Sequence, residues 1–112
     1  MNKFGIYTDK PEISFDTHLA GLEEQTRQLL LSLRTFIKSL GDNVIEETRP
    51  HRIAYAKTLN FRTFVDIQPR NNSLVISIKK GRNKSTITEE INSTSKLDVI
   101  QNQIVDAYRT IK

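Results

Sequence analysis

The sequence contains no cysteine and no tryptophan, and only three prolines and four glycines among its 112 residues. The absence of cysteine excludes a disulfide framework, thiolate catalysis and zinc sites built on cysteine. No segment approaches the ~18–20 consecutive apolar residues that a membrane-spanning helix requires. The first ten residues lack the apolar segment of a secretory signal. We therefore expect a cytoplasmic protein without a membrane partner, folded as a single domain over residues 1–112.

Acidic side chains are scarce in one region of the chain. Between Arg49 and Lys84, Asp66 is the one carboxylate beside nine basic side chains, which gives a local charge of +8 with His51 neutral. Residues 1–48 sum to −3 and residues 85–112 to −1. Charge of one sign concentrated on a segment indicates a polyanionic partner.

The apolar residues predict two helices around a sheet. Residues 1–15 are expected to form an extended arm, because Pro11 excludes a helix through its middle. From Leu19 to Leu40 apolar residues recur every three or four positions, which predicts a helix over 16–40. Gly41 would end this helix in the left-handed conformation. A second apolar stripe predicts a closing helix over 95–111.

Between these helices the pattern changes to strands and turns. Residues 44–80 predict four strands, 44–49, 52–58, 61–69 and 73–80, with Asn71-Asn72 as a tight turn. Alternation along the third strand would place Phe64 on the same face as Arg62 and Asp66. The polar residues 81–93 are expected to form a loop. The fold class is thus α+β, a four-stranded antiparallel sheet with the N-terminal and C-terminal helices packed on one face.

Residues 17–65 also carry motifs of a known family. They are Thr17-His18-Leu19, Ser39-Leu40-Gly41-Asp42, Ile53-Ala54-Tyr55-Ala56-Lys57 and Asn60-Phe61. In these motifs the chain resembles the DUF5655 family, small domains of unknown function that are sometimes labelled "predicted transport protein". The resemblance implies a DNA-related setting with a nuclease-type protein partner and no established activity. Arg52 departs from the aromatic residue usual in the family, and the family's later Gly- and Trp-rich segment is absent.

The sequence does not favour catalysis. His18 and His51 lie far apart along the chain, and a metal site needs three or four converging ligands. Glu46 and Glu47 are adjacent strand residues, so their side chains should point to opposite faces. There is no glycine-rich phosphate loop and no Ser-His-Asp arrangement with supporting context. We expect no enzyme activity, no cofactor and no metal.

Tyr55 and Lys57 have two interpretations. Tyr55 is either a core aromatic covered by the aliphatic part of Lys57, or both residues contact a ligand.

The basic cluster is the strongest functional candidate. We expect phosphate contacts with DNA or RNA from five residues: Arg62, Lys79, Lys80, Arg82 and Lys84. Two alternatives stay open. The basic residues could protect edge strands from aggregation, or the chain could be a protein-interaction domain or homodimer that uses an apolar patch around Phe64 and Val75.

Overall fold

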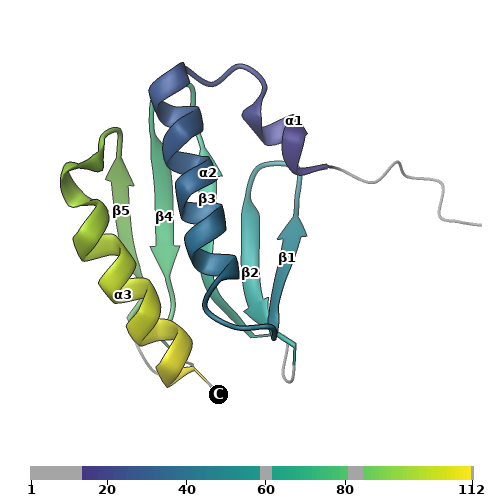
Figure 1. The fold of residues 1–112 in the computed structure, drawn as a ribbon, viewed down its shortest axis with the longest axis vertical. Helices are drawn as coiled ribbons and strands as arrows, with labels where there is room; N and C mark the ends of the chain where they lie inside the picture. Colours follow the sequence, from purple (N-terminus) through teal and green to yellow (C-terminus); the bar gives the residue numbers. More distant parts are fainter. Residues whose placement is uncertain (1–13, 59–61, 81–84, 112) are drawn as a thin grey trace, which may run out of the picture.

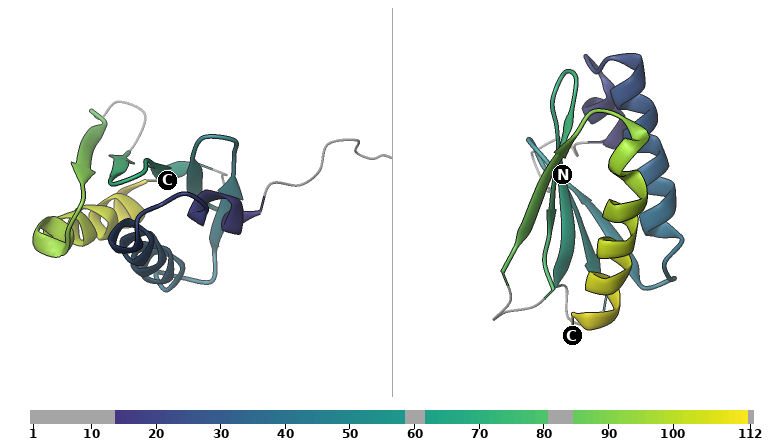
Figure 2. Two further views of the ribbon diagram at one scale, coloured as in Figure 1. Left: turned by 90° about the horizontal axis from the view of Figure 1, so that it is seen from above. Right: turned by 90° about the vertical axis from the view of Figure 1, so that its left-hand side faces the viewer.

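The computed structural model describes residues 14–58, 62–80 and 85–111. In these ranges five strands form one antiparallel sheet, and the long helices α2 and α3 cover the same face of it (Figures 1 and 2). We call this the helix face and the opposite side the open face. The predicted α+β class, with an antiparallel sheet and helices at both ends, is confirmed. The predicted arm lies outside the described residues up to position 13.

The N-terminal helical region is two helices instead of the single helix predicted over 16–40. Helix α1 spans Phe15–Leu19 and α2 spans Glu24–Lys38. The break falls at Ala20, whose backbone is extended, and at Gly21, whose φ of +83° is open mainly to glycine. The apolar period continues across the break because α1 also packs on the core, so periodicity alone did not reveal it.

The sheet has five strands, so the predicted number of four was wrong. Strands β1 (Val44–Thr48), β2 (Ile53–Lys57), β3 (Thr63–Pro69) and β4 (Leu74–Ile78) lie where they were predicted. Strand β5 (Ile87–Ile91) lies inside the predicted loop 81–93. Its sequence is mostly polar because it is an edge strand with one solvent-facing side, and polar alternation of this kind resembles a loop.

The strands follow one another in the order β1-β2-β3-β4-β5. The turn between β3 and β4 is the predicted Asn71-Asn72 turn, closed by a bond from the Arg70 amide to the Ser73 carbonyl at 2.8 Å. Consecutive antiparallel strands reverse direction, so alternate connections lie at the same end of the sheet. The turns after β1 and β3 share one end of the sheet, and strands β2 and β4 end at the other.

Phe64 lies in the core, and its predicted position on the open face was wrong. Between β2 and β3 the register moves from Tyr55–Val65 to Ala56–Thr63, so β3 carries one extra residue, Phe64. Such a bulge redirects a side chain that strict alternation would place on the other face. Phe64 is fully buried, and its ring meets Tyr108 of α3 edge-on at 5.4 Å between centroids. An exposed apolar patch centred on Phe64 is therefore excluded.

Helix α3 spans Leu97–Thr110 and follows a 3-10 turn at Thr94–Lys96. Ile100, Ile104 and Ala107 face the core, as predicted for the inner side of this helix. The Tyr108 hydroxyl donates to Asn43 Oδ1 at 2.6 Å and lies close to Gly41. A Cβ on Gly41 would collide with that hydroxyl, so the glycine is required for a close approach and its φ is not positive. The left-handed conformation predicted for Gly41 was wrong.

Candidate phosphate-binding surface

The strand register brings three of the five predicted phosphate-binding residues together. Arg62 precedes β3 and Lys79 and Lys80 follow β4, and these two termini are at the same end of the sheet. The Lys79 amide donates to the Phe64 carbonyl at 2.9 Å. The Lys57 amide, at the end of β2, donates to the Arg62 carbonyl at 3.3 Å. We call Lys57, Arg62, Lys79 and Lys80 the basic end. Arg82 and Lys84 lie outside the described residues.

Lys79 reaches back onto the open face toward Asp66. Lys79 Nζ and Arg52 Nη1 both contact Asp66 Oδ2, at 3.4 and 3.8 Å. The Asp66 side chain is 6% exposed, whereas those of the two cations are 43% and 45% exposed. One nearly buried carboxylate thus holds two accessible cations side by side. The sequence showed Asp66 as the single carboxylate of its region but gave no sign that Arg52 would join it.

Lys80 forms the second ion pair of the basic end. Its Nζ lies 2.7 Å from Asp106 Oδ2 of α3. The hydrogen bond and the charge of Lys80 lower the pKa of the Asp106 carboxyl. Because water and salt screen a pair as exposed as this one, it contributes little to stability. A phosphate could therefore replace Asp106 as the partner of Lys80 at little cost.

Tyr55 and Lys57 have intramolecular partners on the helix face. Tyr55 is fully buried, and its hydroxyl donates to Glu46 Oε2 at 2.8 Å. Burial, together with the bond to Glu46, raises the Tyr55 pKa. Lys57 Nζ donates to the Ile111 carbonyl at 3.0 Å and lies 4.6 Å from the centroid of the Tyr108 ring. These contacts agree with packing roles, and ligand contact by either residue stays a prediction.

Glu46 is the centre of a polar network that sequence reasoning missed. Arg34 of α2 donates to both of its carboxylate oxygens, at 2.8 and 2.9 Å, and the guanidinium lies 3.9 Å above the Phe15 ring. Burial raises the Glu46 pKa, but the bonds from Arg34 and Tyr55 outweigh it, and the pKa ends below its usual value. The network ties α1, α2 and the sheet together.

The histidines and the glutamate pair that were weighed for catalysis or metal binding have different surroundings in the described residues. His18 is buried, and its Nε2 lies 2.7 Å from the Arg49 carbonyl, whereas His51 is exposed. Glu47 pairs with Arg49, away from the Glu46 network. No group of three or more histidine or carboxylate ligands occurs in the described ranges. Nor does any helix in these ranges have the length and apolar character needed to cross a membrane.

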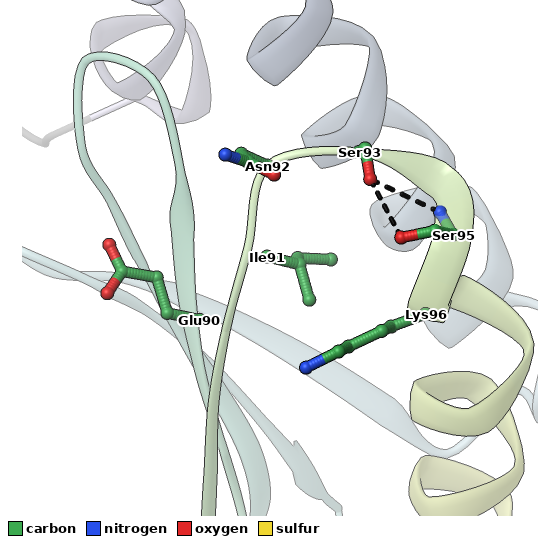
Figure 3. A pocket seen from close by; sticks show the side chains of 6 residues that line it. All are labelled: Glu90, Ile91, Asn92, Ser93, Ser95 and Lys96. Carbon is green, nitrogen blue, oxygen red and sulfur yellow. Dashed lines mark hydrogen bonds between the residues drawn. The ribbon is translucent and has the colours of Figure 1, made fainter.

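Two hollows have linings that include none of the basic-end residues. One, of about 400 Å³, lies over β1 and β2 and is lined by Ile45, Glu46, Glu47, Arg49 and Ala56. The other lies where β5 turns into α3, and there Lys96 extends toward β5 beside Ser93 and Ser95 (Figure 3). Its volume of about 130 Å³ is well below the ~300–1,000 Å³ of typical ligand pockets.

Comparisons of the chain with protein-family models, with curated proteins and with solved structures found no match. The resemblance to the DUF5655 family therefore stays a prediction from the quoted motifs.

Proposed function

We propose that this protein binds the phosphate backbone of nucleic acid through the basic end. The observation that carries the proposal is the juxtaposition of Arg62, Lys79 and Lys80, which come from two separate chain segments and meet at one end of adjacent strands. Lysine and arginine at such spacing neutralise phosphates and release the counterions condensed on the nucleic acid.

The proposed mode of binding is electrostatic and independent of base sequence. In the described ranges the aromatic rings of Phe15, Tyr55, Phe64 and Tyr108 lie on the helix face, engaged in packing, and the ring of Phe36 on α2 packs half-buried against the core. The open face presents short polar and aliphatic side chains such as Val75, Ser77 and Thr88. Phosphate contacts fix the position of a protein on a duplex but carry no sequence information themselves.

The test measures binding of labelled duplexes by fluorescence anisotropy as a function of salt. The wild type should bind at ~50 mM salt, and the log of its binding constant should fall with the log of salt concentration by roughly 0.9 for each phosphate contact on DNA. Replacing Lys79 and Lys80 together by glutamine should flatten this dependence by about 0.9 for each phosphate that the variant no longer neutralises.

A matched control removes the same charge elsewhere. Arg27 and Arg70 are exposed and belong to the opposite end, where α2 begins and the β3–β4 turn lies. Arg27→Gln with Arg70→Gln should leave the salt dependence unchanged. The proposal fails if no DNA or RNA binds at ~50 mM salt, or if both double variants behave alike.

A further inference from the structure

Strand β5 has one unpaired edge in the described structure. The Arg70–Ser73 and Lys79–Phe64 bonds fix which backbone groups of β4 face β3, so those of Leu74, Ile76 and Ile78 face β5. Their partners in β5 are Ile91, Glu89 and Ile87. The backbone N–H and C=O groups of Thr88 and Glu90 therefore point outward, at the edge where the described sheet ends.

Helix α3 extends beyond this edge. Figures 1 and 2 show that α3 begins outside β5 and crosses the helix face of the sheet toward β3. Val99, in its first turns, is 58% exposed and is the one exposed large apolar side chain of the described residues. Val99 is seven residues before Asp106, so both lie on one flank of the helix, whereas Tyr108 points to Asn43 on the other side. Val99 is thus presented on the side of the molecule that β5 borders.

We propose that a second copy of this chain pairs with the β5 edge, so that two sheets join into one of ten strands about a two-fold axis at Thr88. The charges favour this register over the two axes that follow it along β5. An axis at Glu89 or Glu90 would place carboxylates directly opposite each other, which is destabilising. An axis at Thr88 pairs threonine with threonine and sets Glu89 against the partner's Ile87.

The same arrangement accounts for Val99. In the Thr88 register the end of one β5 lies beside the start of the other, so the projecting part of α3 passes over the start of the partner's β5. Ile87 is only half-buried there, because its own α3 has crossed toward β3 at that end. Val99 of each copy would cover the partner's Ile87. One side of the chain supplies both halves of the contact, as a two-fold interface requires.

The test is the mass of the full chain in sedimentation velocity and light scattering over a wide concentration range. The mass should rise from 12.9 kDa toward twice that value. Thr88→Pro removes an outward-facing amide and leaves the bonds to β4 intact, so it should weaken dimerisation at least about tenfold. Thr88→Val keeps the amide and should dimerise as the wild type does. Val99→Glu should weaken the dimer to a similar degree.

A third variant tests the charge argument. The interface holds Glu89 and Glu90 from both copies, so Glu89→Gln should tighten the dimer. Circular dichroism and the melting temperature of a dilute sample establish that each variant is folded. A chain that stays monomeric at every concentration overturns the proposal. A dimer that Thr88→Pro and Val99→Glu leave unchanged overturns it too, because that dimer would use another surface.

Discussion

Replacing Asp66 by asparagine should separate nucleic-acid binding from stability, because the two should change in opposite directions. Asp66 Oδ2 contacts Lys79 Nζ and Arg52 Nη1 on the open face. Asparagine keeps the shape of the side chain and removes its charge. The two cations are then free of a carboxylate that competes with phosphate for them.

The gain in affinity follows from the distances. A phosphate oxygen bound to Lys79 would lie roughly 7 Å from Asp66, where two unit charges in water repel each other by about 0.6 kcal/mol. Removing that repulsion should tighten binding about threefold for each phosphate held at Lys79 or Arg52. The free energy of unfolding should fall by about 1 kcal/mol, because both ion pairs are long and their cations are well exposed.

The assay combines duplex anisotropy at fixed salt with urea unfolding. Asp98→Asn is the matched control, since it changes net charge equally at the start of α3, the end of the molecule opposite the basic end. The reasoning is refuted if Asp66→Asn binds no tighter than Asp98→Asn. Unchanged affinity with reduced stability would show that Asp66, Lys79 and Arg52 stabilise the fold and take no part in binding.

Three further changes test the structure itself. Glu46 has a lowered pKa, so its contribution to stability is complete above the unfolded value of 4.5 and is lost as pH falls through the folded pKa. Below about pH 5 the melting temperature of Glu46→Gln should therefore change less with pH than that of the wild type. Phe64→Ala should cost about 3–5 kcal/mol in urea unfolding, because the ring is buried against Tyr108; a loss below about 1 kcal/mol would contradict the bulge. Gln103 Oε1 is buried without a hydrogen-bond partner in the described ranges, so Gln103→Met should raise the unfolding free energy by about 1 kcal/mol, and a lower melting temperature would show that the amide is satisfied.

The sequence predicted the elements that have a strong period and missed those shaped by single residues. Four strands and the closing helix follow from alternation and from the stripe at Ile100, Ile104 and Ala107. The break at Gly21 depends on one positive φ, and the burial of Phe64 depends on one extra residue in β3. Periodicity averages over many residues, so neither event changes it enough to be detected.

The candidate site was predicted in part for a similar reason. Lys79 and Lys80 were grouped by their adjacency, and Arg62 was added through strand alternation. Arg52 precedes β2 and Asp66 belongs to β3, and only the register between these strands brings the two side chains into contact. Ion pairs between strands depend on that register, which no local pattern encodes.

The salt dependence of binding can show how many of the nine basic residues between Arg49 and Lys84 contact phosphates at the same time. Each strand reversal moves its charges to the other end of the sheet, so Arg49 and Arg70 lie away from Lys57, Lys79 and Lys80, whereas the Arg52 side chain meets Lys79 at Asp66. Contacts by Arg62, Lys79 and Lys80 alone predict a log–log slope of about −2.7 on duplex DNA, and contributions from Arg82 and Lys84 would bring it to about −4.5. A slope near −8 would require all nine basic residues to reach phosphates at once. That result would contradict a site confined to one end of the sheet, because the duplex would then have to cross the open face from turn to turn.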